Sequence, residues 1–134
     1  MKPIYLFLFF FLSIHLTQSQ VIKTPADVVQ ENLNYYNQRN IEGFMSSFPD
    51  TIALYLFGTS DPVAFGKEAI RKLYKDLFDV SPKLHSTILH RIVLGNKVID
   101  HESIKGRKGS KKRTKLVMIY EVSGDEIVRM TVIR

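Results

Sequence analysis

Apolar and polar residues alternate along residues 86–104, and this pattern predicts two β-strands joined by a tight turn. Gly95 and Asn96 separate the two β-rich runs. A two-residue hairpin turn requires positive φ angles, which glycine and asparagine tolerate better than other residues. The sequence therefore predicts a β-hairpin that turns at Gly95 and Asn96.

The turn sets which residues of the two strands face each other. The predicted register pairs Ile92 with Ile99, His90 with His101, Ile88 with Ser103, and Arg91 with Asp100. Because successive side chains of a strand point to opposite faces, the isoleucines share one face with His90 and His101. We predict that this apolar face lines a pocket and that both imidazoles point into it. Arg91 and Asp100 are predicted to form an ion pair on the opposite, outer face.

Helical spacing of apolar residues dominates the chain before this hairpin, and strand patterns follow it. Helices are predicted at residues 25–39, 41–48 and 66–78, a strand at 51–57, and two further strands at 114–122 and 126–133. Thr24, Pro25 and Asp27 form a typical helix start, because threonine caps free amides, proline fits the first turn and aspartate complements the helix dipole. Helices followed by an antiparallel meander are typical of an α+β fold.

The first 19 residues have the pattern of a secretory signal peptide. A basic start at Lys2 precedes an apolar run at residues 4–16, and cleavage is predicted after Ser19. A membrane span needs about 20 apolar residues, so we predict no stable membrane anchor after cleavage. The sequence thus predicts one domain, residues 20–134, in a secreted or periplasmic protein. The chain has no cysteine, so packing alone must stabilise it.

The formal net charge is +6, and a basic run at residues 105–115 has seven Lys and Arg in eleven positions. One interpretation is a solvated, mobile loop between two strands. The other is contact with an anionic surface. No aromatic residue interrupts the run, and base stacking on single-stranded nucleic acid uses such residues. We therefore predict no nucleic-acid partner.

Three segments, in this order along the chain, resemble a known superfamily. They are VVQENLNYYNQRNIEGFMSSFPD at residues 28–50, GKEAIRKLY at 66–74 and ILHRIVLGNKVIDHESIKGR at 88–107. Together with the order of the elements, they are similar to the nuclear transport factor two-like superfamily, which includes SnoaL-like proteins and ketosteroid isomerases. The resemblance implies a cone-shaped α+β domain, in which a bent antiparallel sheet wraps around the N-terminal helices and encloses a pocket. It also implies a homodimer.

Ketosteroid isomerases of this superfamily use two aspartates and one tyrosine, and the resemblance can be compared at those positions. It places Leu56 at the base aspartate, Asn32 at the tyrosine and Met118 at the protonated aspartate. Leucine and methionine cannot transfer a proton, so the isomerase mechanism does not carry over to this chain. The same matching places Ile99 and Ser103 on the pocket side of the sheet.

The predicted pocket takes a small apolar molecule, such as a steroid or a polyketide, with one or two polar groups. Its predicted lining residues are Asn32, Tyr36, Leu56, Ile88, Ile99, Ser103, Met118, Tyr120 and Met130. No cofactor is expected. No metal site is expected either, because His90 and His101 lack a third ligand on their face.

His90 and His101 allow two interpretations. Facing imidazoles in a cone can act as acid and base near neutral pH. They can equally be neutral histidines of the core, each satisfied by a hydrogen bond. Three classes of function therefore remain: a ligand-binding protein, an isomerase-, cyclase- or hydrolase-type enzyme that uses both histidines, and a protein-interaction module.

Overall fold

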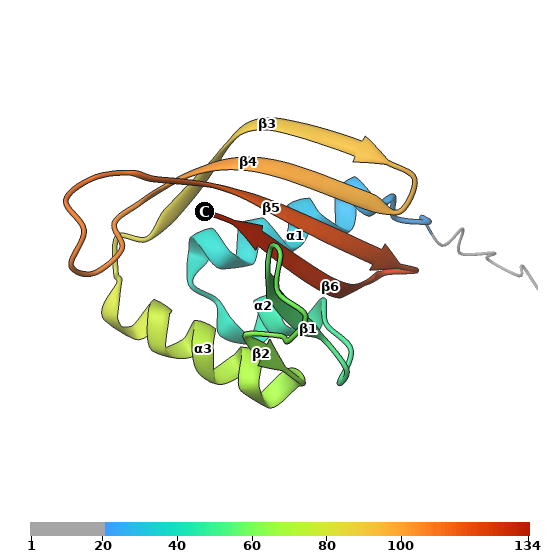
Figure 1. Cartoon of the computed structure of the whole chain (residues 1–134), viewed down its shortest axis with the longest axis horizontal. Helices are drawn as coiled ribbons and strands as arrows, with labels where there is room; N and C mark the ends of the chain where they lie inside the picture. The colour runs from blue at the N-terminus through green and yellow to red at the C-terminus, as the bar shows by residue number, and fades with distance from the viewer. Residues whose placement is uncertain (1–20) are drawn as a thin grey trace, which may run out of the picture.

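The structure is a computed structural model that describes residues 21–134 (Figure 1). Its elements are α1 (Pro25–Gln38), α2 (Ile41–Ser46), β1 (Ala53–Leu56), β2 (Ala64–Phe65), α3 (Lys67–Val80), β3 (His85–Leu94), β4 (Lys97–Lys105), β5 (Thr114–Ser123) and β6 (Glu126–Ile133). The signal peptide predicted at residues 1–19 lies outside the described residues. Within residues 21–134, no helix is both long and apolar enough to cross a membrane.

Six strands form one sheet, in the order β2-β1-β6-β5-β4-β3. β1 runs parallel to β6, and all other neighbouring strands are antiparallel. Figure 1 shows the sheet bending over α1 and α2, with α3 opposite the sheet. The predicted α+β cone with an antiparallel meander is thereby confirmed. The short strand β2 is absent from the sequence prediction, because two residues cannot show an alternating pattern.

Helix α1 begins at the predicted cap. The Thr24 hydroxyl accepts a hydrogen bond from the Asp27 amide at 3.2 Å, and the Asp27 carboxylate accepts one from the Thr24 amide at 2.9 Å. This reciprocal pair satisfies amides that the first turn would otherwise leave free. The buried face of α1 carries Val29, Leu33 and Tyr36, as the helical spacing predicts. The cap and this stripe place α1 inside the curve of the sheet.

Aromatic side chains join the three helices under the sheet. The rings of Phe44 on α2 and Tyr74 on α3 have centroids 4.4 Å apart, and those of Tyr36 on α1 and Phe78 on α3 are 5.4 Å apart. Such tilted and edge-to-face pairs add to the stabilisation that burial alone provides. The cluster fixes α3 against α1 and α2, and it holds Tyr36 and Tyr74 next to the hollow of the sheet.

The hairpin of β3 and β4 turns as predicted, with Leu94 opposite Lys97 and His90 opposite His101. The register then shifts between Ile88 and His90, where β3 bulges. Ile88 therefore faces Glu102, and the predicted pairing of Ile88 with Ser103 is wrong. Alternation counted from the turn cannot detect an extra residue, because a bulge depends on contacts beyond the strand.

Candidate functional site

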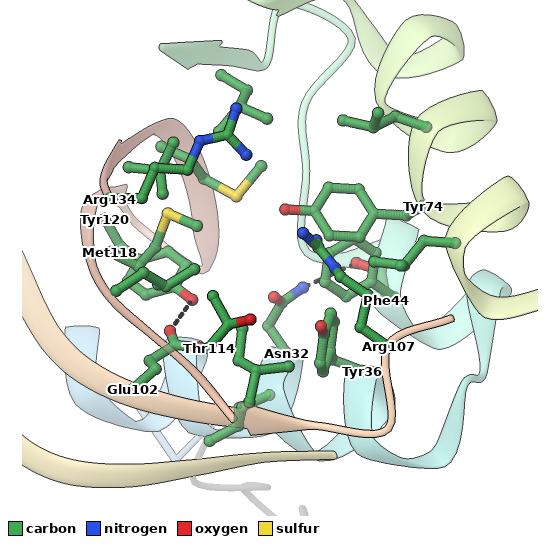
Figure 2. Close-up of a pocket in the computed structure, with 18 of the residues that line it drawn as sticks. Asn32, Tyr36, Phe44, Tyr74, Glu102, Arg107, Thr114, Met118, Tyr120 and Arg134 are labelled. Carbon is green, nitrogen blue, oxygen red and sulfur yellow. Dashed lines mark hydrogen bonds between the residues drawn. The ribbon is translucent and has the colours of Figure 1, made fainter. Parts of the chain in front are cut away.

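A cavity of about 320 Å³ lies between the concave face of the sheet and the three helices (Figure 2). Its apolar walls come largely from strands β4, β5 and β6 and from α3. The apolar lining residues of the sheet include Leu54, Ile104, Leu116, Met118, Met130 and Val132. Ligand pockets are typically concave and apolar, with a few placed polar groups. The polar groups of this cavity therefore decide what it can bind.

Helices α1 and α3 supply polar atoms on one side of the cavity. Asn32 is 2% exposed, and its amide nitrogen donates to the Phe44 carbonyl at 2.9 Å. Its side-chain oxygen is left facing the cavity (Figure 2). Tyr36 and Tyr74 also line the cavity, and within residues 21–134 neither hydroxyl is hydrogen-bonded to another protein group. These three side chains can donate to or accept from a ligand.

Strands β4 and β5 supply a buried carboxyl group on the other side. Glu102 is 4% exposed; one of its oxygens accepts from the Ser86 hydroxyl at 2.7 Å and the other from the Tyr120 hydroxyl at 3.2 Å (Figure 2). Burial raises the pKa of Glu102, and the nearby Asp100 charge adds to the rise, while both hydrogen bonds oppose it. A carboxyl group with a raised pKa can exchange a proton closer to neutral pH than an ordinary glutamate.

The loop between β4 and β5 brings a cation into the cavity. Arg107 lines the cavity, and its Nε is buried with no hydrogen-bond partner within residues 21–134. Figure 2 shows its guanidinium group on the side of Tyr74, away from Glu102. Arg134, which is exposed, lines the cavity as well. The cavity thus combines apolar walls with an amide, phenols, one carboxyl group and guanidinium groups.

His90 and His101 do not reach this cavity. Their rings stack with centroids 5.9 Å apart, but His90 is exposed, His101 is half-buried, and neither lines the cavity. The prediction that the imidazoles point into the pocket is wrong. The opposite face of β4 is the concave one, and it carries Asp100, Glu102 and Ile104.

A buried and neutralised charge explains why the hydrophobic pattern assigns the wrong face of β4 to the pocket. Asp100 can be buried on the concave face because Arg91 neutralises it through bonds of 2.7 and 2.8 Å. The predicted ion pair is present, but it lies on the inner face, and its predicted outer position is wrong. Ile92 and Ile99 instead point outward, where Ile92 is 61% exposed. The more apolar face of a hairpin is therefore not always the buried face.

Comparison with known proteins identifies the family. The model of the SnoaL-like domain matches residues 29–130. The chain belongs to the SnoaL-like domain family. No curated protein matches this SnoaL-like domain.

Solved structures share the fold of this SnoaL-like domain at low sequence identity. A cystatin fold protein from Novosphingobium aromaticivorans has a TM-score of 0.76 and 22% identity, over 84% of this chain and 99% of that chain. A candidate SnoaL-like polyketide cyclase from Jannaschia sp. CCS1 has a TM-score of 0.69 and 12% identity, over 86% and 88%. A candidate ketosteroid isomerase from Kribbella flavida has a TM-score of 0.70 and 14% identity, over 84% and 78%. Identities this low establish the fold alone.

The other residues expected in the pocket of the SnoaL-like domain divide into two groups. Those that line the cavity are Asn32, Tyr36, Met118, Tyr120 and Met130. Those that do not are Leu56, Ile88, Ile99 and Ser103, and their predicted positions are wrong. Ile99 and Ser103 lie on the outward face of β4, together with His101. Leu54 lines the cavity from β1 in place of Leu56, and the bulge displaces Ile88 from its predicted pairing.

Five polar lining residues of the SnoaL-like domain are absent from the sequence prediction, namely Tyr74, Glu102, Arg107, Thr114 and Arg134. Glu102 is missed because the wrong face of β4 was assigned to the pocket. Tyr74 lies on the predicted helical stripe of α3, so its hydroxyl could have been considered beside that of Tyr36. Arg107 belongs to the basic run, and no local signal separates it from its solvent-facing neighbours. Within residues 21–134, no group of three or more metal-ligating side chains is present.

Proposed function

We propose that this SnoaL-like domain binds one small, mostly apolar molecule in the cavity under its sheet. The observation that carries the proposal is a cavity of about 320 Å³ whose apolar walls surround a few convergent polar groups. This volume falls at the lower end of the range for small-molecule sites, roughly 300–1,000 Å³. Ring systems of the steroid or polyketide type suit such walls.

Polar atoms on the helix side support binding of an oxygen-bearing ring system. Asn32 offers an accepting oxygen, and Tyr36 and Tyr74 offer hydroxyls without protein partners. Burial raises the pKa of both phenols, so they remain neutral donors at physiological pH. A carbonyl or hydroxyl group of the ligand can therefore be oriented against α1 and α3.

A cavity-filling variant tests this proposal with a neutral probe. 2-Naphthamide is flat and apolar with one amide group, and we expect it to bind the purified domain in isothermal titration calorimetry. Met118→Trp places an indole in the cavity and is expected to weaken this binding by more than about tenfold. Lys115→Trp, on the exposed face of the same strand, is the control and should leave the affinity unchanged.

Circular dichroism checks that both variants fold. Leu116→Phe, a milder filling of the same wall, serves if Met118→Trp does not fold. Absence of 2-naphthamide binding, or equal affinity in the wild type and a folded cavity-filling variant, would contradict the proposal.

Glu102 favours a second candidate function, which is proton transfer to or from a bound ketone. Its carboxyl group borders the cavity, has a raised pKa and is hydrogen-bonded by Tyr120. A base of this kind can remove a proton next to a carbonyl group, the step common to isomerases and cyclases. This assigns to Glu102 the acid-base role expected of His90 and His101, which lie on the outer face of the sheet.

Glu102→Gln tests both the raised pKa and the proton transfer. The folded state holds the Glu102 proton at pH values where the unfolded chain, with a pKa of about 4.3, has released it. Stability is therefore lost as pH rises above that value, and the glutamine variant avoids this loss. We expect the variant to melt higher than wild type at pH 7 and equally at pH 4, and to lose catalysed deuterium exchange into 2-tetralone, followed by NMR.

A melting difference that is the same at both pH values would contradict the raised pKa of Glu102. Exchange that persists in Glu102→Gln at the wild-type rate would exclude Glu102 as the base. Ser86→Ala serves as the control. That variant removes one hydrogen bond to Glu102 and keeps the carboxyl group.

Export and pairing of two copies form part of the same proposal. The pattern of residues 1–19 supports export, and N-terminal sequencing of the secreted protein should begin at Gln20.

The outer face of the sheet supports pairing of two copies, because Ile92 and Leu94 are 61% and 71% exposed on β3. Light scattering of the mature protein should then give twice the mass of one chain.

A further inference from the structure

The basic run at residues 105–115 has one member that differs from the others. The run forms the end of β4, the loop, and the start of β5. Its other lysines and arginines are exposed, whereas Arg107 is half-buried and lines the cavity. Thr114, at the far end of the loop, lines the cavity too. The loop therefore covers one side of the cavity and directs a single cation into it.

Backbone contacts hold Arg107 in this position. Gly106 has a φ of +77° and lies so close to the Lys83 carbonyl that a Cβ atom would overlap it. The Lys108 amide donates to the Ser81 hydroxyl at 3.0 Å, and Ser81 is fully buried. These contacts fix the backbone on both sides of Arg107. Its inward direction is thus set by the residue before it and the residue after it.

No anion of the described residues 21–134 neutralises the guanidinium group of Arg107. Within residues 21–134 Arg107 forms no ion pair, and its buried Nε has no hydrogen-bond partner. Burial of a charge is unfavourable unless it is paired and hydrogen-bonded. Among residues 21–134, Glu102 is the only acidic side chain that lines the cavity, and it is bonded to Ser86 and Tyr120 instead.

The groups around Arg107 suit an oxyanion with an apolar body. Burial raises the pKa of Tyr36 and Tyr74, and the positive charge of Arg107 partly offsets this rise, so the three groups lie within electrostatic reach. Both phenols can donate to an anion that the guanidinium group neutralises. Apolar side chains of β4, β5, β6 and α3, among them Leu73, Ile104 and Met130, form much of the rest of the wall.

We propose that the ligand of this cavity is an apolar carboxylic acid, bound as its carboxylate by Arg107. This inference rests on the proposed binding function and adds the chemical class of the ligand. The planar fork of arginine matches the two oxygens of a carboxylate, so the guanidinium group of Arg107 suits a ligand with this group.

Two probes of equal shape test the charge of the ligand. 2-Naphthoate and 2-naphthamide share the same ring system and nearly the same shape, but the first carries a negative charge and the second a neutral amide group. We expect 2-naphthoate to bind wild type about tenfold more tightly in isothermal titration calorimetry. Arg107→Met, which keeps an unbranched side chain but removes the guanidinium group, should remove this preference and leave 2-naphthamide binding within about twofold. Lys108→Met carries the same loss of charge in the same loop and should leave both affinities unchanged.

The outcomes separate this inference from the proposed function. If 2-naphthamide binds and 2-naphthoate binds no more tightly, the carboxylate inference is overturned and the apolar cavity stands. A preference for 2-naphthoate that survives in Arg107→Met, or that Lys108→Met also removes, overturns the role of Arg107. If neither probe binds, both proposals fail. Arg107→Lys keeps the charge without the fork, and it is measured if Arg107→Met does not fold; it should reduce the preference.

Discussion

Arg91→Met is expected to lower the free energy of unfolding by about 3–5 kcal/mol, because it leaves the buried Asp100 carboxylate unpaired. Asp100 is 0% exposed, and Arg91 binds both of its oxygens, through Nε at 2.7 Å and Nη2 at 2.8 Å. A third nitrogen of Arg91 donates to Gln30 on α1 at 3.0 Å. The pair therefore ties the edge strand β3 to β4 and to the central helix. Urea unfolding of wild type and variant measures the loss.

Two controls distinguish burial from charge in this prediction. Lys72 and Asp76 form an exposed ion pair on α3, so Lys72→Met should change the free energy of unfolding by less than about 1 kcal/mol. The double variant Arg91→Met with Asp100→Leu replaces the buried pair by apolar groups and should recover most of the lost stability. A loss below about 1 kcal/mol for Arg91→Met would show that Asp100 is not buried as described.

Gly106→Ala is expected to destabilise the domain by about 3 kcal/mol or more and to impair ligand binding. Gly106 adopts a φ of +77°, which is strained for alanine. A Cβ at this position would also overlap the carbonyl of Lys83, so the backbone of the loop must move. That movement displaces the neighbouring Arg107 from the cavity. Urea unfolding gives the stability, and titration with 2-naphthoate gives the binding.

Gly109→Ala separates the cost of the backbone conformation from the cost of the overlap with Lys83, because Gly109 is a matched position in the same loop. Gly109 has a φ of +79° in the same loop, but nothing lies within 4 Å of a Cβ placed there. Only the cost of the backbone conformation remains, and we expect a loss of about 1 kcal/mol with unchanged binding. Equal losses for the two alanine variants would mean that the contact of Gly106 with Lys83 is unimportant.

The elements of the fold could be predicted because their signals act over short distances. Thr24 and Asp27 form the cap at the start of α1 with each other, and Gly95 and Asn96 define the turn of the hairpin. Each signal depends on residues only a few positions apart. The same holds for the register near the turn, which is right as far as His90. It fails one residue later at the bulge, where longer-range contacts act.

The site was only partly predictable, because burial of a polar residue depends on distant partners. The sequence pattern alone predicts that Glu102 faces solvent. In the structure its carboxyl group is buried and accepts hydrogen bonds from Ser86 and Tyr120. The same pattern predicts that its neighbour His101 lines the pocket, because His101 shares a face with Ile92 and Ile99. A hydrophobic pattern shows where the apolar side chains lie. It does not show which polar or charged side chains have partners that allow them to be buried. The assignment of the two faces of β4 therefore required the tertiary structure.

By itself, the sequence determined the order of the helices and of every strand except β2, the helix cap, the hairpin turn and the α+β class, because these features arise from interactions within a few residues. The tertiary structure decided which face of the hairpin is concave and which charges enter the cavity. Asp100 and Arg107 illustrate the reason. Asp100 is buried because Arg91 of the adjacent strand neutralises it, and Arg107 points inward because Gly106 fits against the backbone of Lys83.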